Sequence, residues 1–160
     1  MGMKITQQSI ARVCNYLGSA NEAVETACAE VYAEAGAYIV DSIRSGRMSD
    51  WDDQTGNLRS SIGYVVCVKG RVVKMSDFSI VREGAEGARK GRELAERLAR
   101  ELSSRDMALI IVAGEEYAVY VEAVEGKVVL SSAYIHLERT MPSMLKERIR
   151  KVLSDYENRH

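Results

Sequence analysis

Several residue types are scarce in this sequence, and each scarcity excludes a class of structure. Proline occurs once and histidine twice in 160 residues, and the three cysteines are widely spaced with no C-x-x-C pair: Cys14, Cys28 and Cys67. This odd number and spacing argue against a disulfide framework or a zinc site, and favour buried free thiols. No apolar run approaches the ~20 residues of a membrane-spanning helix, and the N-terminus has no signal-peptide core. We therefore expect a protein made in the cytoplasm, with no membrane partner.

Charge of one sign is also lacking. The net charge of −1, from 22 basic and 23 acidic residues, gives no overall attraction to nucleic acid or to an anionic membrane. Any DNA contact would have to come from one local patch. The length and a hydrophobic fraction of 46% fit one domain over residues 1–160, which buries roughly two-thirds of its surface on folding.

No set of residues has the spacing of a catalytic, cofactor-binding or metal site. The three glycines of segment 84–91 match neither phosphate-binding glycine pattern, and no strong strand precedes them, so a solvated, flexible loop is predicted. The cluster Asp50, Asp52 and Asp53 lacks the acidic spacing of a calcium loop and is interpreted as a solvated turn. The sequence thus predicts a protein that is not an enzyme and holds no cofactor or metal.

Two helices are predicted near the N-terminus, over about 6–17 and 19–45. Gly18 is placed as the stop of the first, and Ser19 and Glu22 have the spacing of a capping box that starts the second. Apolar residues recur at seven-residue intervals through both helices: Ile10, Leu17, Val24, Val31 and Tyr38. This seam is expected to pack on a sheet or on another helix, with a coiled coil as the alternative.

A sheet is predicted over about 60–130. Tyr64–Val68 and Val72–Met75 are expected to form a hairpin, covered on both faces because their alternation is imperfect. Met107–Ala113 is a continuous apolar run, which is typical of a central strand buried on both faces. Segment 117–123 is either a strand or a short helix, since its period does not separate the two.

A charged insertion over 76–105 interrupts this sheet, and a helix follows it. The insertion contains an amphipathic helix over 93–102, with Leu94, Leu98 and Leu102 on one stripe. A C-terminal helix is predicted over about 132–155. Pro142 either kinks this helix or starts its second half, with Thr140 as the N-cap. The fold class is therefore α+β, with a long N-terminal and a C-terminal helix packed on a small curved, mainly antiparallel sheet.

A turn-rich segment, Trp51–Tyr64, connects the long helix to the first strand. Its Asp, Asn, Ser and Gly residues are those that turn a chain. Trp51 has two interpretations. It is a lid over the end of the core, or it is an aromatic anchor at a subunit contact, where tryptophan is over-represented.

Two short motifs resemble the head–tail joining, or tail-completion, proteins of tailed-phage necks. The first is Thr-Gly-x-Leu-x-Ser-Ser-Ile over 55–62, after a long helix. The second is Tyr-Ala-x-Tyr-Val-Glu over 117–122, after a predicted central strand. Their order and spacing agree with the family from about Asn21 to Val152. The chain departs from the family in lacking a Gly-Thr-rich turn after the second motif and in carrying a long insertion over 82–105.

The resemblance implies a non-enzymatic virion protein of a tailed phage or prophage, placed in the neck. Copies would assemble as a hexameric ring or a multiple of it, contacting the portal or adaptor and the tail-tube proteins. DNA would pass through the bore without specific binding. Candidate interface residues come from both motifs and the basic segment: Trp51, Thr55, Gly56, Leu58, Tyr117, Tyr120, Arg89, Lys90 and Arg92. The alternative function is a nucleic-acid-binding module whose basic face is segment 89–100.

Overall fold

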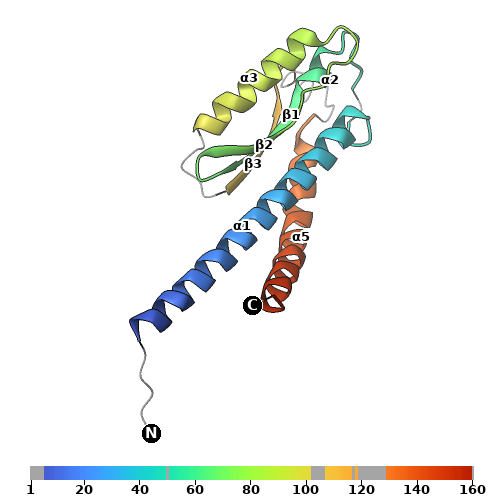
Figure 1. The fold of residues 1–160 in the computed structure, drawn as a ribbon. Coiled ribbons are helices and arrows are strands. Elements are labelled where there is room, and N and C mark those ends of the chain that lie inside the picture. Colours follow the sequence, from blue (N-terminus) through green and yellow to red (C-terminus); the bar gives the residue numbers. More distant parts are fainter. Residues whose placement is uncertain (1–5, 50, 102–106, 117, 119–128, 160) are drawn as a thin grey trace.

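The computed structural model describes residues 6–49, 51–101, 107–116, 118 and 129–159. Their helices and strands are α1 (Gln7–Arg44), α2 (Asn57–Ser61), β1 (Ile62–Val68), β2 (Arg71–Met75), α3 (Ala85–Glu101), β3 (Met107–Ala113) and α5 (Ser131–Glu157) (Figure 1). The predicted α+β class is confirmed, with a small antiparallel sheet and a long helix from each end of the chain. The predicted element at 117–123 lies outside the described residues, apart from Ala118.

The sheet lies between two helical layers because its middle strand sends side chains in both directions. β1 pairs antiparallel with β2 and with β3, so that Val65 is opposite both Met75 and Ile110. Ile62, Tyr64 and Val66 join a core with α1 and α5. The alternate residues of β1 join a second core with α3 (Figure 1). β1 is consequently buried along its whole length, so the predicted two-sided cover is confirmed for this strand of the hairpin. It is wrong for β2, whose residues Arg71–Lys74 are exposed.

The continuous apolar run at 107–113 forms a strand, but among the described strands it does not take the predicted central place. Among the described strands the order is β2-β1-β3, so β3 lies at an edge and β1 lies in the middle. The run is apolar because α1 packs on one face of β3 and α3 packs on the other. An unbroken apolar run therefore indicates cover on two faces, which an edge strand can also have.

The predicted break at Gly18 is also wrong, because α1 is one helix of 38 residues. Thr6 is its N-cap and accepts from the backbone N–H of Ser9 at 3.2 Å. The expected capping box does not form, since the Ser19 hydroxyl donates back to the carbonyl of Asn15 at 3.1 Å. One glycine costs a helix only about 1 kcal/mol, which the turns on both sides outweigh.

The N-terminal part of α1 extends beyond the sheet and beyond the end of α5 (Figure 1). Val31 of the seven-residue seam is buried, with 1% of its surface exposed, whereas Ile10 and Leu17 are 53% and 59% exposed. The turn between β1 and β2 reaches α1 at Glu25, which pairs with Lys69. Of these seam residues, only Val31 is fully covered. Tyr38, at the end of the seam, is 52% exposed, and its ring centre lies 5.5 Å from that of His136 on α5.

The C-terminal helix agrees with its predicted range and packs along α1. It continues through Pro142, so the alternative in which Pro142 starts a second half is wrong. The Thr140 hydroxyl donates to the carbonyl of His136 at 2.9 Å and does not cap a new helix. In the part of the chain that the structure describes, no helix combines the length and the apolar character needed to cross a membrane.

Candidate interaction surfaces

The segment between α1 and β1 is built around the carboxylate of Asp53. This side chain is buried, and its two oxygens accept from the backbone N–H groups of Gly56 at 2.9 Å and Arg59 at 2.7 Å. The guanidinium of Arg82 donates to the backbone carbonyl of Asp53 at 2.6 Å. The prediction of a solvated turn is thus wrong for Asp53, which holds the loop in place and caps α2.

The motif over 55–62 supplies structural contacts at this junction. Ser60 and Ser61 are fully buried; the Ser60 hydroxyl accepts from the N–H of Val81 at 2.9 Å, and the Ser61 hydroxyl donates to the carbonyl of Leu58 at 2.8 Å. Leu58 is 1% exposed and belongs to the core under α1. Gly56 has φ +83°, and the carbonyl of Val81 occupies the space of a Cβ. Gly56 and Leu58 therefore serve the fold and do not form an exposed contact.

Trp51 lies in the core, where 5% of its surface is exposed. The guanidinium of Arg59 lies 5.0 Å from the centre of the indole ring and also donates to the carbonyl of Arg44. Within the described residues the indole N–H has no acceptor. The lid interpretation agrees with this position, whereas the aromatic anchor would need an exposed ring. Thr55 is exposed, and Tyr117 and Tyr120 lie outside the described residues.

The basic segment on α3 is neutralised by its own neighbours. Arg89 donates to Glu86 at 3.0 Å and to Glu93 at 2.6 Å, and Lys90 donates to the buried carboxylate of Glu115 at 3.0 Å. The hydrogen bond that Lys90 donates to Glu115 raises the pKa of Lys90, and the one that Glu86 accepts from Arg89 lowers the pKa of Glu86. These charges are exposed or half-buried, but each is already partnered.

The third residue of this segment, Arg92, is held from a different direction. Its guanidinium donates to the carbonyl of Asp77 at 2.8 Å and lies 5.9 Å from the centre of the Phe78 ring. It therefore pins the chain that leads into α3. The basic candidates at 89–92 form a network within the chain, and no row of unpaired cations results.

The three glycines at 84–91 are packed and ordered, so the prediction of a flexible loop is wrong. Gly87 and Gly91 lie within α3 and are buried. A Cβ at Gly87 would come within 2.7 Å of the Cα of Asn57, and one at Gly91 within 2.8 Å of the Phe78 ring. Gly84, just before the helix, similarly has no room beside Ser60. Glycine at these positions lets α3 lie backbone to backbone against α2, which packs the predicted insertion into the domain.

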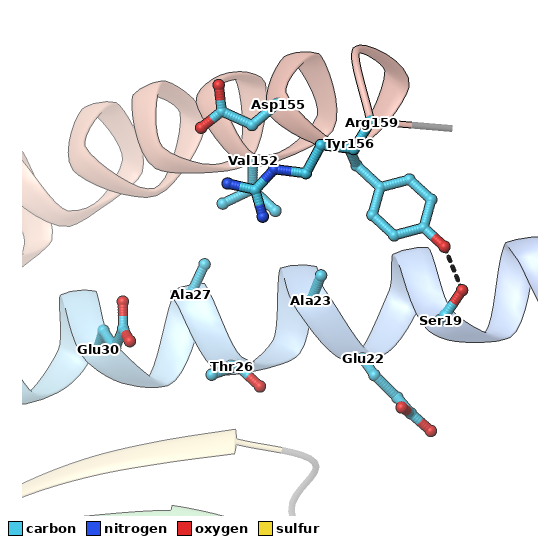
Figure 2. Close-up of a pocket in the computed structure, with 10 residues that line it drawn as sticks. All are labelled: Ser19, Glu22, Ala23, Thr26, Ala27, Glu30, Val152, Asp155, Tyr156 and Arg159. Carbon is cyan, nitrogen blue, oxygen red and sulfur yellow. Dashed lines mark hydrogen bonds between the residues drawn. The ribbon is translucent and has the colours of Figure 1, made fainter.

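A cleft of about 710 Å³ separates α1 from α5 on the side away from this junction (Figure 2). Tyr156 closes one end by a hydrogen bond with Ser19, and its ring meets the Tyr16 ring with centroids 5.1 Å apart. Beyond the other end, Arg148 binds Glu30 at 3.1 Å and Glu34 at 2.8 Å. Small side chains leave the space between the helices, namely Ala23 and Ala27.

One ionisable group enters this cleft, since Figure 2 shows the Arg159 guanidinium in the space between the helices. Figure 2 shows the carboxylates of Glu22 and Asp155 pointing away from the space between the helices. In the described ranges, no group of three or more His, Cys, Asp or Glu side chains is placed to hold a metal ion. The cleft is therefore a gap between two clasped helices, and its described side chains form no metal-binding group.

Exposed aliphatic side chains gather at the free end of α1. Ile10, Val13 and Leu17 are 53%, 57% and 59% exposed, and their spacing places them on one side of the helix. On the outer strand of the sheet, Val72 and Val73 are about half exposed, at 48% and 50%. Aliphatic surface of this kind marks contact sites when it is contiguous. The free end of α1 is therefore one candidate interaction surface among the described residues, beside other exposed apolar side chains such as Ile80 and Tyr134, at 61% and 68%.

Comparison of the chain with protein-family models, with curated proteins and with solved structures found no match. The features that sequence reasoning missed are mostly contacts between distant segments. Ser19 and Tyr156 are 137 residues apart, and Arg148 and Glu30 are 118 apart. No local pattern signals such pairs. Asp53 was recognisable in part, because Asp three residues before a Gly-Asn turn is a common loop acceptor.

Proposed function

We propose that this chain is a non-enzymatic structural protein of a tailed phage or prophage, acting in the neck as a head–tail connector or tail-completion component. Copies assemble as a ring, hexameric or a multiple of that, between the portal or adaptor and the tail tube. DNA passes through the bore without specific binding. The chain is made in the host cytoplasm and functions in the virion.

The observation that carries the proposal is the position of the motif over 55–62. These residues join a helix of 38 residues to the central strand of a small antiparallel sheet, which is the arrangement that the resemblance implies. Exposed aliphatic surface on α1 and on β2 supports it, because a ring needs interfaces that are repeated on each copy. The near-zero net charge suits a bore through which DNA must move.

Assembly with neck proteins tests the proposal directly. The purified chain is imaged by negative-stain electron microscopy and followed by light scattering, alone and with the portal, adaptor or tail-tube protein encoded near it. Rings, or co-assembly with one of these partners, are expected. A chain that stays monomeric at high concentration and engages none of the partners would refute the proposal. Each partner alone provides the baseline.

The nucleic-acid-binding alternative has less support. Arg89 and Lys90 each form ion pairs with carboxylates, and Arg92 donates a hydrogen bond to the carbonyl of Asp77. A nucleic-acid phosphate would have to displace these partners before it could pair with one of the three cationic side chains. We therefore keep this function as an outcome to be measured and do not propose it.

A further inference from the structure

The free end of α1 has the sequence pattern of a helix that packs on another helix. We define the arm as residues 7–20 of α1. Starting from Ile10, the positions at alternating spacings of four and three residues are Cys14, Leu17, Asn21 and Val24. This is the spacing of a coiled-coil seam, in which one polar residue among apolar ones sets the register. The same spacing continues to Val31, which is 1% exposed, whereas Ile10 and Leu17 of the arm are each more than half exposed.

The arm is also nearly free of charge. Arg12 is its one charged residue, whereas 28% of the whole chain is charged. The helical period places Arg12 on the side opposite to Leu17. An exposed helix usually carries charges on its free face, while the centre of an interface is depleted of them. Two copies of the arm can therefore approach along this seam without like charges meeting.

We infer that the arms of neighbouring copies pack on one another along the seam of Ile10, Cys14 and Leu17. The occupant of this surface is thus a second copy of the chain. This arm contact rests on the proposed function, because it would be the contact between neighbouring copies in the proposed ring. The seven-residue repeat and the missing charge favour a helical partner of the same kind over an extended or charged one.

The size of the arm sets the strength of this contact. Three aliphatic side chains, each more than half exposed, leave roughly 250 Å² of apolar surface per copy. Two arms would then bury roughly 500 Å², well below the ~1,200 Å² of a stable complex. The pairing is therefore weak for an isolated pair and gains strength when a ring adds further contacts. A test must capture a transient contact.

Cys14 provides the test, because it is an exposed thiol on the seam, whereas Cys67 is buried. The full chain is treated with a short bismaleimide over a range of concentrations and analysed by denaturing electrophoresis and peptide mass spectrometry. Cross-linked dimers joining Cys14 to Cys14 are expected. In the matched control, Cys14→Ser combined with Asn15→Cys moves the thiol about 100° around the helix, off the seam, and should cross-link at least ~10-fold less.

A second pair of variants separates the seam from general effects of charge. Leu17→Asp should reduce cross-linking at Cys14 at least ~10-fold, because each dimer loses two buried leucines. Asn15→Asp, which lies off the seam, should leave it unchanged. Circular dichroism checks that both variants remain helical. Equal cross-linking of the two variants would overturn the inference. So would dimers that depend on Leu17 but do not link Cys14 to Cys14, since the arm would then dock elsewhere.

This outcome is independent of the test of the proposed function. Rings or portal complexes that survive Leu17→Asp would refute the arm contact and leave the neck role standing. Arm dimers in a chain that never binds a neck protein would support the arm contact and refute the neck role.

Discussion

A single substitution, made at two glycines, should change stability in opposite directions. Gly87→Ala adds a Cβ that would lie 2.7 Å from the Cα of Asn57 and nearer still to its carbonyl group. These are backbone atoms of α2, so no side chain can rotate aside. Overpacking of this kind costs up to about 3 kcal/mol, and the higher helix propensity of alanine returns about 1 kcal/mol. The expected net loss is about 2 kcal/mol.

Gly18→Ala is the matched control, because the same atom enters open space. A Cβ at Gly18 meets no heavy atom within 4 Å, so only the propensity remains, a gain of up to about 1 kcal/mol. Urea unfolding followed by circular dichroism measures both variants. With a typical urea dependence, Gly87→Ala should lower the midpoint by about 1 M. If Gly87→Ala proved as stabilising as Gly18→Ala, the close packing of α3 on α2 would be refuted.

Three further outcomes are expected. Asp53→Ala leaves two backbone N–H groups without their acceptor, and should lower the free energy of unfolding by about 3 kcal/mol in the same assay, against a smaller loss for Asp53→Asn. Burial raises the pKa of the Cys67 thiol, so less of its reactive thiolate is present at pH 8. Thiol labelling followed by mass spectrometry should therefore modify Cys14 first and Cys67 only after urea is added. Equal labelling of the two cysteines in the folded chain would contradict this. Charge reversal at Arg89 and Lys90 should leave fluorescence anisotropy with duplex DNA unchanged near physiological salt, and a fall in binding would favour the nucleic-acid alternative.

Much of the element order could be predicted from periodicity, and the errors have specific causes. Gly18 was taken as a helix stop because glycine often ends helices. Its φ is not among the positive values that such an end uses, and those occur instead at Gly46, Gly56 and Gly70. The helix continues because the residues after Gly18 are clasped to α5 through Ser19 and Tyr156. A contact between residues so far apart in the chain cannot be predicted from the local spacing of apolar residues.

The glycines at 84–91 show a different limit. Glycine marks both flexible loops and close approaches of backbone, and a single sequence does not separate them. The charged residues between these glycines favoured a loop. They lie instead on the solvent side of α3, while Gly87 faces α2 and Gly91 faces the end of α2 and the Phe78 ring. Asp53 was misassigned for the same reason, since its acceptor role depends on which backbone N–H groups the fold turns toward it.

The two ends of α1 are held by contacts of different strength, and this difference bears on assembly. From Val31 onward, α1 is fixed in the core, and the loop after it is fixed by Asp53 and by the buried serines of the motif. Before Ser19, the described chain shows mainly the edge-on contact of Tyr16 with Tyr156. A partner can therefore bind the arm without moving any core residue. A partner that acts on the loop at 53–61 would have to expose the buried side chains at this junction. We therefore expect assembly to alter hydrogen exchange first in the arm, with the junction unchanged, and the reverse order would contradict the proposed contact between arms.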